Sequence, residues 1–307
     1  MQFNQLPGSG LRVSQIALGT LTWGRGVTAE TAGDLLRAYR DFGGNMIDTS
    51  VSYPGMEILG ELIGQAPDRD ELTITCKSGV RIEDGAPVPD ASRGHLMRGL
   101  DAALTTLGTD HVDVWLLEAW DPRTPLDETL AALETAQRSG RATYVGLANA
   151  AGWQLAVAAS TSPVPLVATE VEYSLLQRQA DYEVLPAADY LRLGVFASSP
   201  LGRGVLSGKY RHGKPRDSRA ALSAWSAFTD DYRDERSGRI VEAVSAAASG
   251  LNISLTEVAL GWLTRQETVT SMITGARTET QLKEVLGSAD VEVPDEVLDA
   301  LDDVSTG

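Results

Sequence analysis

The stretch SRGHLMRGLDAALTTLGTDHVDVWLLE, residues 92–118, contains one complete helix–strand unit. Its first part has apolar residues at three- and four-residue spacing, which predicts an amphipathic helix. Ser92 is a candidate N-cap of this helix, and Gly108 is a candidate stop signal at its end. The apolar run 112–118 then predicts a buried strand, which ends on the carboxylate of Glu118.

The same pattern recurs along the whole chain. Segment 28–43 predicts another amphipathic helix, with Thr28 as N-cap and Gly43 as stop. Eight strand–helix repeats predict a parallel sheet that closes into a (β/α)8 TIM barrel, one α/β domain over residues 1–307. An open doubly wound sheet is the alternative, but no Gly-x-Gly-x-x-Gly turn follows the first strand. The other strand candidates are 14–20, 45–50, 72–77, 142–148, 165–171, 192–198 and 270–275.

Two further features accompany the predicted barrel. We expect a short β-hairpin at the N-terminus and long loops after the barrel strands. The longest of these loops, residues 206–235, is rich in Ser, Arg, Asp and Gly and exceeds the length of an ordinary βα loop. Its length and composition predict a functional flap over the site.

Composition limits the classes of partner. The formal charge is −16, from 26 basic and 42 acidic residues, which argues against nucleic acid and anionic membranes. One cysteine, Cys76, excludes an intrachain disulfide framework and fits a reducing compartment. The N-terminus lacks a signal-peptide pattern, and no apolar run approaches the roughly eighteen residues of a membrane span. We therefore expect a cytoplasmic protein with a small-molecule substrate, no bound metal and an oligomeric state that the sequence leaves open.

Polar residues stand at the predicted carboxyl ends of successive strands. In a closed barrel these ends meet at one face, where the βα loops form the site. A carboxylate at the end of a buried run, such as Glu118, costs roughly several kcal/mol unless it is paired or protonated. Glu118 therefore either faces water or belongs to a site. The polar strand ends are Thr20, Asp48, Lys77, Glu118, Asn149, Glu170 and Ser198.

A series of ordered segments resembles the aldo-keto reductase family. The resemblance covers nearly the whole chain and implies the eight-stranded barrel. It also implies hydride transfer from a nicotinamide cofactor, usually NADPH, to a carbonyl group. The segments are LPGSGLRVSQIALGTLTWG (6–24), DTSVSY (48–53), EILGELI (57–63), ITCKSGV (74–80), TLGTDHVDVWLL (106–117), RATYVGLAN (141–149), EVEYSLLQR (170–178), SPLGRGVLSGKY (199–210) and GARTETQLKE (275–284).

The resemblance also implies a catalytic group. Tyr53 matches the tyrosine that gives a proton to the substrate oxygen, Lys77 the lysine beside it, and Asp48 the carboxylate that holds the lysine. A phenol has an ordinary pKa near 10, so a neighbouring ammonium is needed to stabilise its phenolate. The trio is physically coherent for proton transfer.

Glu118 stands where the family usually has a histidine. The steroid 5-beta-reductases of that family resemble this chain in having glutamate there, and they reduce a carbon–carbon double bond conjugated to a ketone. We expect Glu118 to lie beside Asp48, away from bulk water, and to keep its proton. A neutral carboxylic acid donates a strong hydrogen bond to an enone oxygen, as a protonated Asp does in ketosteroid isomerase. Together with Tyr53 it would stabilise an enolate.

The resemblance places an NADP(H) site on residues near the strand ends, with NAD(H) as the open alternative. Arg203 and Lys209 are expected near the pyrophosphate, and Arg277 near a 2′-phosphate. Ala148, Glu170 and Ser198 replace the usual Ser, Gln and aromatic residue, which could weaken nicotinamide binding by roughly two or three orders of magnitude. The predicted cofactor residues are Gly19, Thr20, Asn149, Glu170, Ser198, Ser199, Leu201, Gly202, Arg203, Gly204, Lys209, Gly275, Arg277, Gln281 and Glu284.

Three tryptophans on strand-end loops, Trp23, Trp120 and Trp225, are candidates for an apolar wall of the substrate pocket, with ordinary loop packing as the alternative. Two other functions stay open. One is a redox-neutral dehydratase, cyclase or epimerase, with Glu118 or Glu170 as base and Tyr53 as acid. The other is a non-catalytic nucleotide-sensing or partner-binding subunit.

Overall fold

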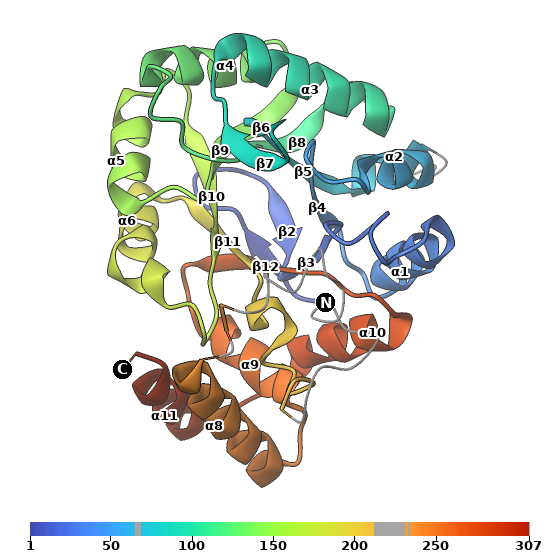
Figure 1. Ribbon diagram of the computed structural model, residues 1–307, viewed down its shortest axis with the longest axis vertical. Coiled ribbons are helices and arrows are strands. Elements are labelled where there is room, and N and C mark those ends of the chain that lie inside the picture. The colour runs from blue at the N-terminus through green and yellow to red at the C-terminus, as the bar shows by residue number, and fades with distance from the viewer. Residues whose placement is uncertain (65–68, 212–230, 233, 307) are drawn as a thin grey trace.

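Eight parallel strands close into a barrel in the computed structural model, which describes residues 1–64, 69–211, 231–232 and 234–306 (Figure 1). The ring runs β3-β4-β5-β8-β9-β10-β11-β12, and β12 pairs with β3 to close it. This confirms the predicted barrel and excludes the open sheet. The barrel strands are β3 (Ile16–Gly19), β4 (Met46–Ser50), β5 (Thr73–Ser78), β8 (Val112–Leu117), β9 (Ala142–Ala148), β10 (Leu166–Glu172), β11 (Gly194–Ser198) and β12 (Val269–Thr274).

Helices follow each strand and surround the barrel (Figure 1). Thr28 caps the first helix by accepting a hydrogen bond from the Thr31 N–H, and Gly108 ends the third in the left-handed conformation. Ser92 precedes that third helix, but its hydroxyl donates to Asp90 and makes no cap bond. The helices are α1 (Ala29–Asp41), α2 (Met56–Gly64), α3 (Arg93–Leu107), α4 (Leu126–Arg138), α5 (Gly152–Thr161), α6 (Val184–Leu191), α8 (Glu235–Leu251), α9 (Leu255–Thr264), α10 (Glu279–Gly287) and α11 (Asp295–Thr306), with short 3-10 turns η1 (Arg69–Glu71), η2 (Gln179–Tyr182), η3 (Gly202–Gly204) and η5 (Ser288–Asp290).

Two antiparallel hairpins lie outside the barrel. Strands β1 (Phe3–Gln5) and β2 (Arg12–Ser14) form the expected N-terminal hairpin. Strands β6 (Val80–Glu83) and β7 (Ala86–Pro89) form a second hairpin between β5 and α3, which the sequence analysis did not predict. Its turn residues, Asp84 and Gly85, both have positive φ, the conformation that two-residue hairpin turns prefer.

Alternate residues of each strand face the barrel interior. Val114 and Leu116 of β8 belong to a cluster inside the barrel, whereas Trp115 and Leu117 pack in the larger cluster beneath the helices. Cys76 packs in that outer cluster, while its neighbour Lys77 faces the interior. The side chains at the carboxyl ends of the strands are therefore directed inward by the same alternation that buries the core.

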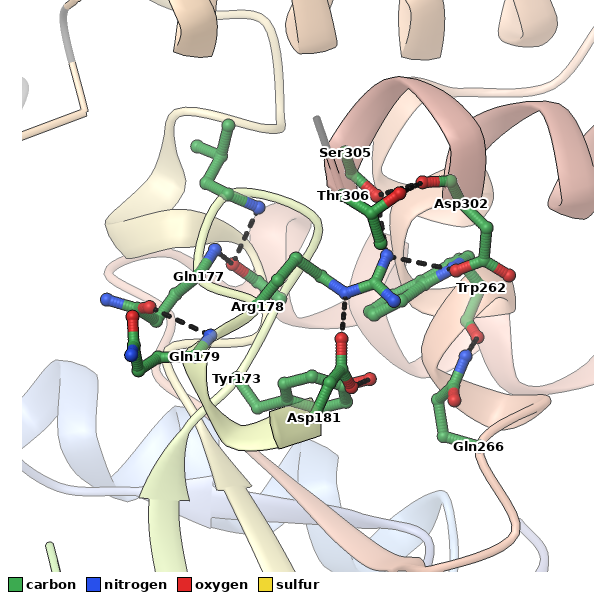
Figure 2. Close-up of polar contacts among 12 residues, drawn as sticks. Tyr173, Gln177, Arg178, Gln179, Asp181, Trp262, Gln266, Asp302, Ser305 and Thr306 are labelled. Atoms are coloured by element: carbon green, nitrogen blue, oxygen red, sulfur yellow. Dashed lines mark hydrogen bonds and ion pairs between the residues drawn. The ribbon is translucent and has the colours of Figure 1, made fainter. Parts of the chain in front are cut away.

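The loop after β10 is tied to the C-terminal helix by ionic hydrogen bonds (Figure 2). The Arg178 guanidinium donates to Asp181 at 2.5 Å, to Asp302 at 2.9 Å and to the Ser305 hydroxyl at 2.6 Å. It also lies over the Trp262 ring, whose indole N–H donates to Asp302 at 2.9 Å. These contacts fix α11 against α9 and the β10 loop.

Part of the predicted flap, 212–230 and 233, lies outside the described residues, and so does Trp225. Of the helices in the described part of the chain, none is alone long and apolar enough to cross a membrane. The pair α8 and α9 would pass on length and composition, although the two helices are bent by 100° at their junction.

Tyr39 of α1 fastens the amino-terminal ends of β3 and β4. Its hydroxyl lies 2.7 Å from Ser14 Oγ and 2.8 Å from the carbonyl oxygens of Ile16 and Met46, and the Met46 N–H donates to it at 3.1 Å. Burial raises the pKa of Tyr39 above its usual range. The neutral phenol thus connects α1 to β3 and β4 through buried hydrogen bonds.

We predict that Tyr39→Phe lowers the free energy of unfolding by about 1–3 kcal/mol, because the Ser14 hydroxyl and the backbone groups of Ile16 and Met46 lose a buried hydrogen-bond partner. Urea denaturation followed by circular dichroism measures this loss. Tyr190→Phe is the matched control, since Tyr190 is 87% exposed, and it should change stability by less than about 0.5 kcal/mol. Equal stability of the two variants would contradict the assigned role of Tyr39.

Candidate active site

A cavity of about 460 Å³ opens at the carboxyl ends of the barrel strands. Most of the predicted site residues line it together, although they come from widely separated parts of the chain. Its volume is in the range of small-molecule and cofactor sites. The predicted residues on its wall are Gly19, Asp48, Tyr53, Lys77, Glu118, Asn149, Glu170, Ser198, Ser199, Leu201, Arg203, Gly204, Lys209, Gly275, Arg277, Gln281 and Glu284.

Lys77 is buried between two carboxylates. Its Nζ lies 2.5 Å from Asp48 Oδ1 and 2.9 Å from Glu170 Oε2, and the three residues are 2%, 3% and 5% exposed. Burial alone disfavours the ammonium, but the two carboxylates outweigh it and raise the pKa of Lys77 well above its ordinary value. Lys77 therefore stays charged at neutral pH.

Asp48 and Glu170 are like charges at close range in this buried group. Burial, followed by the Glu170 carboxylate, raises the pKa of Asp48 well above its usual range, although Lys77 acts in the opposite direction. One ammonium does not neutralise two carboxylates, so negative charge is concentrated around Lys77 in this buried group.

Tyr53 lies on the loop after β4 and lines the same cavity. Its ring centroid is 5.4 Å from Lys77 Nζ, and no hydrogen bond among the described residues joins its hydroxyl to that ammonium. Burial raises the pKa of Tyr53; Lys77 lowers it, but nearby carboxylates raise it again, with a net increase. Tyr53 is thus a neutral phenol with a strong preference for keeping its proton.

The sequence predicted Glu118 beside Asp48. In the structure it is Glu170 that shares the Lys77 ammonium with Asp48. Both Glu118 oxygens instead accept hydrogen bonds from serines, from Ser50 Oγ at 2.7 Å and from Ser52 Oγ at 2.9 Å. The Asn149 side-chain amide donates to the Glu118 backbone carbonyl at 2.9 Å. The two serines were missed, although their spacing of two residues around the end of β4 is a signal that they could face one partner.

The loop that follows β11 contributes several residues to the cavity wall. Ser199, Gly202, Arg203 and Gly204 all have positive φ, from 51° to 92°. The Gly202 and Gly204 N–H groups donate within this loop, to the carbonyl oxygens of Ser199 at 2.8 Å and Leu201 at 2.9 Å. A Cβ on Gly204 would lie 2.7 Å from Lys209 Nζ, so the ammonium lies directly over this turn.

Besides Lys77, the cations Arg203, Lys209 and Arg277 line the cavity. Lys209 stands over the turn, and Arg277 precedes α10, where its backbone N–H donates to Gln281 Oε1 at 3.0 Å. Arg203 is engaged differently from the expected pyrophosphate contact. Its guanidinium donates twice to Glu172, at 2.9 and 2.7 Å, and once to Asp231 at 2.9 Å. Arg203 thus binds Glu172, a cavity residue that the sequence analysis missed.

In the described part of the chain, four predicted site residues do not line the cavity. Thr20 donates to the Asp48 carbonyl at 3.0 Å, and a Cβ on Gly202 would meet Leu176. Trp23 is fully buried in the core, and Trp120 packs edge-to-face against Trp153 with centroids 5.6 Å apart. Within the described ranges, no group of three or more His, Cys, Asp and Glu side chains could hold a metal ion.

Comparison with known proteins gives a consistent family match. The model of the Aldo/keto reductase family matches residues 15–306. The chain is 33% identical to the "Uncharacterized oxidoreductase YrpG" of Bacillus subtilis (strain 168), over 100% of this chain and 97% of the relative. It is also 33% and 31% identical to proteins of Oryza sativa subsp. japonica and Arabidopsis thaliana, each named "Probable voltage-gated potassium channel subunit beta", over 95% of this chain and 92% of each relative.

We predict that Lys77→Met lowers the free energy of unfolding by about 3–5 kcal/mol at pH 7, because it leaves two buried carboxylates without a cation. In the variant these groups keep protons that the unfolded chain releases, so its stability should rise as the pH falls toward about 5. The deficit relative to the wild type should therefore shrink. Urea denaturation at both pH values measures this change.

Lys283→Met is the matched control for this experiment. Lys283 is exposed and pairs with Glu279 at 2.6 Å on one face of α10, so its loss should cost less than about 1 kcal/mol at either pH. If Lys77→Met is as stable as Lys283→Met at pH 7, the buried charges do not depend on Lys77.

Proposed function

This chain belongs to the Aldo/keto reductase family, and on that premise we propose that it is an NADP(H)-dependent reductase of a small carbonyl compound, with Tyr53 as proton donor. One observation carries the proposal. A single cavity contains Tyr53 and Lys77 together with the cations Lys209 and Arg277. A proton donor and these two cations in one cavity suit a reductase that holds its cofactor by phosphate groups.

Several cavity residues fit a dinucleotide. The Lys209 ammonium would bind the pyrophosphate, and Arg277 and Gln281 would bind the adenosine side. A guanidinium at that place favours the additional 2′-phosphate of NADP(H) over NAD(H). When bound, the reduced nicotinamide supplies a hydride.

Tyr53 supplies the proton that completes the reduction. As the carbonyl carbon gains a hydride, Tyr53 gives its hydroxyl proton to the carbonyl oxygen, and C=O becomes CH–OH. The resulting phenolate then takes a proton from water. Positioned acids of this kind contribute roughly 10²–10⁴ in rate. Burial raises the pKa of Tyr53, so the hydroxyl still carries its proton when a carbonyl substrate binds.

Glu118 decides between two acceptor groups. A protonated Glu118 would favour reduction of a conjugated carbon–carbon double bond, because it could donate to the enone oxygen. The hydroxyls of Ser50 and Ser52 both point at its oxygens, which favours an accepting carboxylate. We therefore place carbonyl reduction first and double-bond reduction second.

A redox-neutral acid–base reaction is the second candidate function. Its support is Glu170, which stands where the family usually has a glutamine. Glu170 is a carboxylate that binds Lys77. A dehydratase, cyclase or epimerase would use this carboxylate with Tyr53. Turnover without any nucleotide would distinguish it from the reductase.

We predict that Tyr53→Phe lowers kcat for NADPH-dependent aldehyde reduction by about 10²–10⁴-fold, because the substrate oxygen loses its proton donor. The dissociation constant for NADPH, measured by quenching of protein fluorescence, should stay within about threefold of the wild type. Absence of quenching by millimolar NADPH in the wild type would rule out the reductase. Unchanged kcat in the variant would remove Tyr53 from the reaction.

We predict that Glu118→His increases the share of carbonyl reduction over double-bond reduction when an α,β-unsaturated ketone is the substrate. A histidine ring N–H donates to the ketone oxygen, whereas the glutamate carboxylate can only accept. Product analysis by chromatography gives the ratio directly. A ratio equal to that of the wild type would count against any part of Glu118 in choosing the acceptor group.

A further inference from the structure

Position 170 has an unexpected partner. Glu170 was expected to contact a nicotinamide amide, but its Oε2 lies 2.9 Å from the Lys77 ammonium. The contact crosses the barrel, because β8 and β9 lie between β5 and β10 in the ring. Lys77 consequently has a carboxylate on two sides, with Asp48 at 2.5 Å from β4.

The two carboxylates offset much of the electrostatic effect of the Lys77 ammonium on Tyr53. Both carboxylates contact the ammonium directly, whereas the Tyr53 ring centroid is 5.4 Å away. Among the described residues, no hydrogen bond connects the Tyr53 hydroxyl with Lys77 Nζ. The charged groups that act on Tyr53 are Lys77 from β5, Asp48 from β4, Glu170 from β10 and Glu118 after β8. Three negative groups thus oppose one positive group.

We propose that Glu170 is a positioning residue that holds the Lys77 ammonium between two carboxylates, without a hydrogen bond to the Tyr53 hydroxyl, so that Tyr53 acts as a neutral acid and not as a base. The inference rests on the proposed role of Tyr53. Its chemical consequence is the protonation state of Tyr53, whose hydroxyl keeps the proton that reduction of a carbonyl oxygen consumes.

The first test uses the cofactor-free wild type and its Tyr53→Phe variant. The ultraviolet absorbance of phenolate is recorded against pH in both proteins, and the difference reports Tyr53 alone. We expect no difference up to about pH 11, because Tyr53 stays neutral beyond the ordinary pKa of a phenol. A difference with a midpoint at or below about pH 10 would overturn the proposal, and this result needs no variant at position 170.

The second test repeats this titration in Glu170→Gln, with and without Tyr53→Phe. Glutamine keeps the shape of the side chain and removes its charge, so Lys77 keeps only Asp48 as a carboxylate partner. The midpoint for Tyr53 should fall by about one pH unit or more, which means at least about tenfold more phenolate at a given pH. An unchanged midpoint in a folded Glu170→Gln protein would overturn the proposal.

Glu172→Gln is the matched control. It removes a carboxylate from the same strand and the same cavity, but Glu172 binds Arg203 and not Lys77. It should leave the Tyr53 titration unchanged; an equal shift in both variants would show a general charge effect and contradict a specific role for Glu170. All titrations are independent of turnover. A failed search for reductase activity therefore overturns the proposed function, whereas the Tyr53 titrations alone decide the role of Glu170.

Discussion

A buried ammonium bonded to two carboxylates constrains the carboxyl end of this barrel. Removing such charges from water costs several kcal/mol for each ion, by order of magnitude, and only close pairing offsets that cost. Lys77, Asp48 and Glu170 meet this condition because β5, β4 and β10 direct them to one point inside the ring. The closed barrel therefore makes the charge cluster possible, and the cluster in turn fixes Lys77 relative to Tyr53.

The cavity combines two kinds of chemistry. Carboxylates contact Lys77 near Tyr53, and the cations Lys209 and Arg277 also line the cavity. Cations suit an anionic cofactor, and a neutral phenol suits a substrate that receives a proton. Glu118, bound by two serine hydroxyls, adds an acceptor to the same cavity. The family relationship and this combination of groups are consistent with one reductase site.

The sequence predicted the barrel well because its signals are local. Periodicity, caps and glycine stops define each strand–helix unit, and all eight predicted strands are present within a few residues of the expected bounds. The hairpin of β6 and β7 was missed, although Asp84-Gly85 is a recognised hairpin turn. Trp23 illustrates the opposite error: its place on a strand-end loop suggested a pocket wall, but its ring is buried in the core. Loop position alone does not give the direction of a side chain.

The sequence by itself determined the fold class, the family and most of the residues that gather at the carboxyl ends of the strands. Only the tertiary structure decided which of those residues bind each other. It paired Lys77 with Glu170 across the barrel, gave Glu118 to Ser50 and Ser52, and engaged Arg203 with Glu172. The physical reason is that strand periodicity fixes which way a side chain points, while pairing depends on distances across the closed ring. Those distances join residues far apart in the chain, and a single sequence carries no local record of them.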